Sequence, residues 1–76
     1  MLLDFQERMV EEYKVLNDRI EKFGKFVDSD KFYTLDLMEQ ALQRWQYDSM
    51  QSYRNALRRR ALHQGFDPLT GGELEG

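Results

Sequence analysis

Apolar residues recur at helical spacing along two long stretches of the chain. In residues 3–27 they follow one another at intervals of three or four positions, at Met9, Tyr13, Leu16, Ile20, Phe23 and Val27. Residues 36–64 carry two overlapping seams, one of Met38, Leu42, Trp45 and Ser49, the other of Gln46, Met50, Tyr53, Leu57 and either Arg60 or Ala61. Such intervals place side chains on one helical face. The pattern predicts two amphipathic helices, and its two seams indicate that the second contacts more than one neighbour.

Polar and special residues indicate where each predicted helix begins and ends. Asp4 and Asp36 each precede a glutamate by three residues, which is the spacing of a helix N-cap and its acidic partner. Gly65 suits a left-handed C-terminal cap, and Pro68 cannot continue a helix. We therefore expect a helical oligomerisation and ligand-binding domain over residues 1–65 and a flexible, acidic, glycine-rich tail over residues 66–76.

The chain is too short to bury both faces of two such helices within itself. It has 76 residues, and a domain of this size hides only roughly 60% of its unfolded surface, so small folds commonly rely on disulfides, metals or oligomerisation. There is no cysteine, which removes disulfides and thiolate metal sites and suits a reducing cytosol. We expect an all-α helical hairpin that assembles into a homo-oligomeric bundle, with any binding site between chains.

Charge and hydropathy argue against two classes of partner. The formal net charge is −3, which does not favour polymeric nucleic acid. No apolar run approaches the roughly 20 residues of a membrane span. Residues 1–4 have no basic segment ahead of an apolar core, so we expect no signal peptide and no membrane partner.

Arg58, Arg59 and Arg60 form the strongest local concentration of positive charge. Three consecutive helical residues span roughly 200°, so they cannot share one face. Complementation of the helix dipole and solubility account for Arg58 and Arg59. Arg60 follows Tyr53 by seven positions, on the apolar side, where an unpaired guanidinium is costly. It therefore needs a partner, either a carboxylate of a neighbouring chain or a bound phosphate.

Two further features allow both a structural and a ligand-binding interpretation. Tyr13 is either a core tyrosine whose hydroxyl finds a partner or a platform on which a base stacks near cations. The segment between the helices brings together Ser29, Lys31, Tyr33 and Thr34. These residues supply either turn chemistry and capping or hydroxyl groups, a cation and free N–H groups for an anion.

No residue pattern indicates catalysis, a metal or a cofactor. The one histidine, His63, is typical of a surface residue, and there is no P-loop, dinucleotide fingerprint or nucleophile–base pair. The acids Asp28, Asp30, Asp36 and Glu39 lack the spacing and the glycine of an EF-hand loop. We expect a binding protein rather than an enzyme, with no cofactor and no metal.

Three strings of residues stand in a distinctive order. They are the run 5–23, the run 26–32 followed by Leu35, and the spaced pattern Gln46-x-x-x-Met50-x-x-Tyr53-x-x-x-Leu57-x-x-Arg60. Together they cover residues 5–61 and resemble a family of small helical proteins of tailed and crAss-like phages. Some members of that family are anti-CBASS cyclic-nucleotide sponges, which provide immune evasion for the phage.

The resemblance implies a compact homohexamer in the cytoplasm of the infected bacterial host. Such a sponge sequesters the cyclic di- and trinucleotides that bacterial defence cyclases make, without cleaving them. Dinucleotides are expected in pockets between protomers, and trinucleotides where three chains meet. By its place in the matched strings, Tyr13 takes the role of the tyrosine that stacks on a base, and Arg60 that of the arginine of the trinucleotide pocket.

The resemblance also implies a ligand-binding lysine and hydroxyl near the turn between the helices. Lys31 lies in the matched string, and Lys25 is a rival one turn earlier; Ser29 or Thr34 is the hydroxyl. A second interpretation of the whole chain is a phage protein–protein interaction module with no nucleotide ligand. An apolar surface left exposed after homo-oligomerisation would favour that second function.

Overall fold

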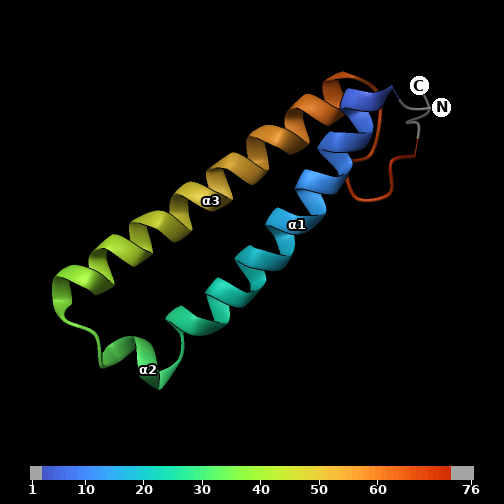
Figure 1. The fold of residues 1–76 in the computed structure, drawn as a ribbon. Coiled ribbons are helices and arrows are strands. Elements are labelled where there is room, and N and C mark those ends of the chain that lie inside the picture. Colours follow the sequence, from blue (N-terminus) through green and yellow to red (C-terminus); the bar gives the residue numbers. More distant parts are fainter. Residues whose placement is uncertain (1–2, 73–76) are drawn as a thin grey trace.

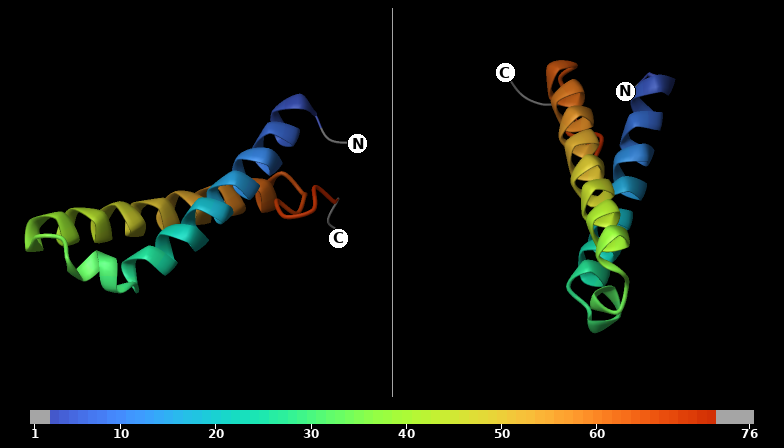
Figure 2. Two further views of the ribbon diagram at one scale, coloured as in Figure 1. Left: turned by 60° about the horizontal axis from the view of Figure 1, so that its bottom comes forward. Right: turned by 90° about the vertical axis from the view of Figure 1, so that its left-hand side faces the viewer.

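The computed structural model describes residues 3–72 and shows an all-α helical hairpin. Helix α1 spans Asp4–Val27, the short helix α2 spans Asp30–Tyr33, and helix α3 spans Leu37–His63. The chain reverses at α2, so the start of α1 and the end of α3 lie at the same end of the hairpin (Figure 1). The two long helices are inclined to one another rather than parallel (Figure 2), and the principal axes of the molecule measure 48 × 21 × 15 Å.

The predicted starts of the long helices are confirmed for α3 and wrong by one residue for α1. The Asp36 carboxylate accepts a hydrogen bond from the Glu39 backbone N–H at 2.8 Å, so Asp36 is the N-cap of α3. Asp4 is instead the first helical residue of α1. The Gln6 side-chain oxygen accepts from the Leu3 backbone N–H at 2.9 Å. Because this glutamine satisfies the free donor at Leu3, the helix begins one residue earlier than the aspartate pattern predicts.

The connection between the long helices contains a helical turn, α2, that the sequence pattern does not predict. A four-residue helix is unstable alone, so packing must hold it. Phe32 of α2 is fully buried. Its ring meets the ring of Phe26 edge-on at 5.9 Å between centroids, and the Arg44 guanidinium lies 4.9 Å from its centroid. The burial of Phe32 therefore fixes the turn to both long helices.

One face of each long helix forms the core of the hairpin. The buried residues of α1 are Met9, Tyr13, Leu16, Ile20 and Val27, and those of α3 are Leu57 and Ala61. The seam predicted on the first helix is therefore confirmed, apart from Phe23, which is half-buried. Of the two residues considered for the end of the second seam, Ala61 enters the core. Arg60 is exposed within the single chain, so its expected partner, a carboxylate of a neighbouring chain or a bound phosphate, stays a prediction.

Helix α3 ends in a Schellman motif, as Gly65 and Phe66 indicate. Gly65 has φ of 88°. Its N–H donates to the Leu62 carbonyl at 3.0 Å, and the Phe66 N–H donates to the Ala61 carbonyl at 3.1 Å. The Phe66 ring is buried in a cluster with Met9 and Ala61, which joins the end of α3 to the start of α1.

The boundary predicted between residues 65 and 66, and the flexibility predicted for residues 66–76, stay predictions. Pro68 is buried, and the Asp67 N–H donates to the Gly72 carbonyl at 2.8 Å. Residues 1–2 of the predicted domain and residues 73–76 of the predicted tail lie outside the described residues.

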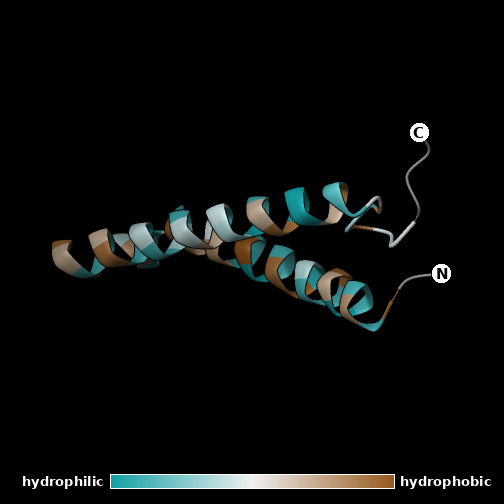
Figure 3. Cartoon of the chain, turned by 90° about the horizontal axis from the view of Figure 1, so that it is seen from above, coloured by the Kyte–Doolittle hydropathy of each residue, from teal (hydrophilic) through white to brown (hydrophobic). Residues whose placement is uncertain are grey.

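The first seam of α3 faces away from α1. Its residues Met38, Leu42 and Trp45 are 68%, 46% and 71% exposed. Hydrophobic segments are visible in the first turns of α3 as well as along α1 (Figure 3). We call Met38, Leu42 and Trp45 the outer seam. Within residues 3–72 the hairpin covers only one of the two predicted seams, so the second neighbour predicted for this helix and the number of chains stay predictions.

Gly24 admits an aromatic side chain of α3 close to the α1 backbone. A Cβ at this position would lie 2.8 Å from the hydroxyl oxygen of Tyr47 and 3.4 Å from its Cζ. The Tyr47 ring stacks on Phe23 with 5.6 Å between centroids. A glycine within a helix lowers helix stability and also leaves room for a close approach, and both effects apply at Gly24.

We predict that Gly24→Ala and Tyr47→Phe are energetically coupled. In the Tyr47→Phe background, Gly24→Ala raises the free energy of unfolding by about 1 kcal/mol, because alanine favours the helix and the hydroxyl contact is gone. In the native background the steric clash with the hydroxyl cancels most of that gain. Urea unfolding of the four variants at one protein concentration measures the coupling, and equal effects of Gly24→Ala in both backgrounds would contradict it.

Candidate functional site

The six candidate binding residues form two groups in one chain. Lys25, Ser29, Lys31 and Thr34 lie at the end of the hairpin that carries α2, whereas Tyr13 and Arg60 lie toward the other end. Tyr13 and Lys25 are twelve positions apart on α1, which is about 18 Å along a helix at 1.5 Å per residue. The hairpin therefore brings the turn residues together but separates them from Tyr13.

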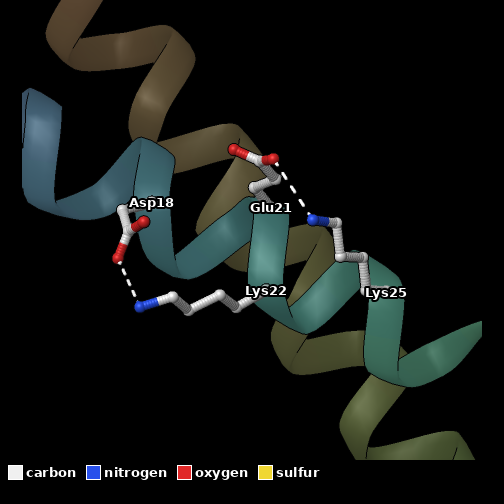
Figure 4. A network of polar contacts seen from close by, with 4 residues as sticks. All are labelled: Asp18, Glu21, Lys22 and Lys25. Carbon is white, nitrogen blue, oxygen red and sulfur yellow. Dashed lines mark ion pairs between the residues drawn. The ribbon is translucent and has the colours of Figure 1, made fainter.

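The lysines near the turn are exposed and only weakly held. The Lys25 ammonium lies 3.5 Å from a carboxylate oxygen of Glu21, and the two side chains are 77% and 70% exposed. Lys22 and Asp18 form a similar pair at 2.9 Å (Figure 4). Exposed i,i+4 pairs of this kind contribute about 0.3–0.5 kcal/mol. Lys25 is therefore free to move to a more strongly charged anion, and Lys31 is exposed as well.

The two candidate hydroxyl groups donate to the backbone of their own turn. Ser29 Oγ donates to the Phe26 carbonyl, and Thr34 Oγ1 donates to the Lys31 carbonyl at 2.6 Å. These bonds satisfy carbonyl groups at the ends of α1 and α2, which is the capping interpretation of both residues. A phosphate accepts hydrogen bonds only, so each hydroxyl must rotate away from its carbonyl before it can donate to one.

Arg44 contributes to the turn and was not among the predicted site residues. Its guanidinium packs on the Phe32 ring, and its Nη2 donates to the hydroxyl of Tyr33 at 3.4 Å. It thus ties α2 to α3 and adds a third cation to the turn end of the hairpin. No local signal reveals this role, because Arg44 follows Tyr33 by eleven residues and meets it only after the chain reverses.

Tyr13 lies inside the hairpin core. Its side chain is 6% exposed and packs in a cluster with Leu16, Ile20 and Leu57. Within the single chain Tyr13 is therefore a core tyrosine, which is the first of its two interpretations. The face of its ring is covered within the chain, and its role in stacking on a base stays a prediction.

Glu12 and Tyr53 connect the two long helices beside Tyr13. The Tyr53 hydroxyl donates to a carboxylate oxygen of Glu12. This hydrogen bond, followed by burial and the negative charge of Glu12, raises the pKa of Tyr53 above its ordinary value, while the positive charge of Arg60 acts in the opposite direction. Arg60 therefore lies in the field of a carboxylate–tyrosine pair. The sequence pattern places Tyr53 on a seam but gives no sign that Glu12 is its partner.

The described residues contain neither a metal-binding cluster nor a membrane span. Within residues 3–72, no three His, Cys, Asp or Glu side chains come together as metal ligands would. In the same part of the chain, no helix has the length and apolar character needed to cross a membrane.

The chain belongs to the Sequestin family, whose sequence model matches residues 3–63. The match covers both long helices and the turn between them. The chain is also similar to a protein of Enterobacteria phage T4 described as an uncharacterised 7.5 kDa protein of the denB–rIIB intergenic region. The two are 41% identical over 59 residues, which are 78% of this chain and 92% of the phage protein. No solved structure matches the chain. The resemblance to a family of small phage proteins is thus confirmed at the level of the family.

Proposed function

We propose that this chain is an anti-CBASS sponge that binds cyclic di- and trinucleotide messengers in the cytoplasm of the infected bacterium and sequesters them without cleavage. The observation that carries the proposal is the Sequestin match over residues 3–63, since the family name suggests sequestration. The exposed cations support it. Lys25 and Lys31 at the turn, and Arg60 near the end of α3, lie on a chain whose net charge is −3. Local cations on an acidic surface attract a small anion while the whole chain repels polymeric nucleic acid.

The proposed working unit is a homohexamer. Two features of the hairpin support an assembly. The outer seam of Met38, Leu42 and Trp45 is uncovered in one chain, and burial of apolar area is the main driving force for association. The distance of about 18 Å along α1 between Tyr13 and Lys25 means that neighbouring chains are needed to bring Tyr13 and the turn residues to one dinucleotide. The pockets of the proposed sponge therefore lie between subunits.

Sequestration requires affinity and no chemical step. A lysine beside a phosphate makes charge-assisted hydrogen bonds, which are roughly twice as strong as neutral ones. A base stacked on an aromatic ring adds about 1–3 kcal/mol. Because Tyr13 is in the core, the helices must separate locally around its ring for a base to reach it. The proposed roles of Lys25 or Lys31, and of Ser29 or Thr34, need no such rearrangement beyond rotation of a hydroxyl.

Release of ligand by heat tests the sequestering function directly. The protein is incubated with cyclic di- and trinucleotides, passed through a filter that retains protein, then heated and analysed by liquid chromatography. We expect the filtrate to be depleted of messenger before heating and to contain intact messenger afterwards. Linear or hydrolysed products after heating would identify an enzyme instead, and an undepleted filtrate would contradict the sponge.

Replacement of Tyr13 tests base stacking. Tyr13→Leu keeps an apolar side chain in the core but removes the aromatic face, so we expect the hairpin to remain helical and the dinucleotide affinity to fall about tenfold or more. Tyr13→Phe, the matched control, retains the ring and the affinity. Isothermal titration calorimetry measures both, with circular dichroism as the check on folding. An unchanged affinity of Tyr13→Leu would remove this residue from the pocket.

Arg60 is the residue proposed for the trinucleotide pocket. It is exposed, so Arg60→Ala leaves the core intact, and we expect it to weaken trinucleotide binding about tenfold while dinucleotide binding is unchanged. Arg59→Ala, an exposed neighbour in the same helix turn, is the control and retains both affinities. If Arg60→Ala weakened the binding of both ligand classes equally, Arg60 would have a structural role and not a role specific to one pocket.

The outer seam favours a second candidate function, a protein–protein interaction module without a nucleotide ligand. Three large apolar side chains on one helical face are typical of a docking surface. The two functions differ in what Trp45→Ser changes. In the sponge this substitution weakens the homo-oligomer and with it nucleotide binding, whereas in the interaction module it leaves the oligomer unchanged.

A further inference from the structure

A groove lies between α1 and α3, near the turn and apart from Tyr13 and Arg60. It is shallow and largely open to solvent, with a volume of about 460 Å³, which is within the range of small-molecule sites. From α1 it is lined by Arg19, Lys22, Phe23 and Phe26, at positions i, i+3, i+4 and i+7, so these side chains share one face of that helix. From α3 it is lined by Gln43, Gln46 and Met50, which share a face in the same way.

Both charged residues that line the groove are basic. The chain has 14 acidic and 11 basic residues, so a wall with two cations and no acid departs from the average of the molecule. Arg19 and Lys22 are one helical turn apart and both exposed. Lys22 is paired only with the exposed carboxylate of Asp18, among the described residues. Two neighbouring cations repel each other, and an anion between them relieves that repulsion.

The floor of the groove is apolar and held in place by its neighbours. The Phe23 ring stacks on Tyr47 with 5.6 Å between centroids, and the Phe26 ring meets Phe32 edge-on at 5.9 Å. Met50 packs against the core of the hairpin. These three residues are half-buried, so the floor exists before any ligand arrives and presents aromatic and thioether surface to a flat ring.

Two side-chain amides lie on the wall opposite the cations. Gln43 Nε2 donates to a carboxylate oxygen of Glu39 at 2.9 Å, which fixes the orientation of that amide and leaves its oxygen able to accept. Gln46 is exposed. A glutamine amide offers one donor and one acceptor side by side, the pattern that pairs with the edge of adenine.

We propose that this groove is a purine nucleotide site within a single chain, with the base on the Phe23–Phe26–Met50 floor and the phosphate between Arg19 and Lys22. The ligand class rests on the proposed function, but the site does not depend on an assembly. It shares no residue with the two groups of candidate site residues, so it adds a binding position to each subunit rather than completing a pocket between subunits.

A titration of the ¹⁵N-labelled chain with adenosine 5′-monophosphate, followed by NMR, tests the groove. We expect the side-chain amide signals of Gln43 and Gln46 to shift with a common saturation curve. Adenosine and inorganic phosphate, each of which has half of the recognition elements, should each bind about tenfold or more weakly. Arg19→Gln and Lys22→Gln should each weaken the binding of the monophosphate about tenfold. Arg8→Gln, an exposed arginine elsewhere on α1, is the matched control, and circular dichroism verifies the fold of each variant.

The outcomes separate the groove from the sponge. The groove site is overturned if the glutamine signals do not shift, or if the variants bind the monophosphate as the native chain does. This holds whatever the results with cyclic nucleotides are. Loss of monophosphate binding in Arg19→Gln with full retention of cyclic dinucleotides supports a groove distinct from the pockets between subunits. Monophosphate binding in the groove by a chain that retains no cyclic nucleotide supports the groove and contradicts the proposed function.

Discussion

Leu57 and the α1 seam hold the two long helices together, and the arrangement of the other elements depends on this contact. Leu57 packs in one cluster with Tyr13, Leu16 and Ile20. At the two ends of the hairpin a single buried phenylalanine extends the core, Phe32 at the turn and Phe66 beyond α3. Because apolar burial is the dominant favourable term in folding, these three contact points fix which faces of α1 and α3 are covered. The outer seam and the groove are the surfaces that these contacts leave exposed on a single hairpin.

The elements with strong local signals could be predicted from the sequence, and those that depend on the reversal of the chain could not. The seam on α1, the Asp36 cap and the Gly65 stop are local, and each appears where periodicity and capping chemistry place it. The α2 turn is held by Phe32, which packs on Phe26 nearby in the sequence and on Arg44 from α3, so no local window of sequence contains the whole cause.

The same division applies to the candidate site. The exposed lysines near the turn, and the hydroxyl residues beside them, follow from the sequence, since turns gather polar residues at the surface. The burial of Tyr13 and the exposure of Arg60 depend on which of two adjacent helical faces meets the partner helix. Arg60 and Ala61 are separated by one position, which is about 100° around the helix. Periodicity alone allows either residue to end the seam. Packing against α1 places Ala61 in the core.

Charge distribution connects the fold to the proposed ligand. An acidic chain with exposed cations at the turn and near the end of α3 suits a small, doubly or triply charged anion better than a polymer. At Tyr53 the two signs of charge act against each other, because the Glu12 carboxylate raises the pKa of the Tyr53 hydroxyl and the positive charge of Arg60 lowers it.

The proposed sponge requires that several chains assemble and take up cyclic nucleotides intact. Native mass spectrometry of the protein, with and without a panel of cyclic di- and trinucleotides, tests it most directly. We expect a homohexamer whose mass rises by whole numbers of unmodified ligands. An oligomer that gains no ligand mass would contradict the sponge and favour the interaction module, and a monomer under all conditions would contradict the assembly on which both functions depend.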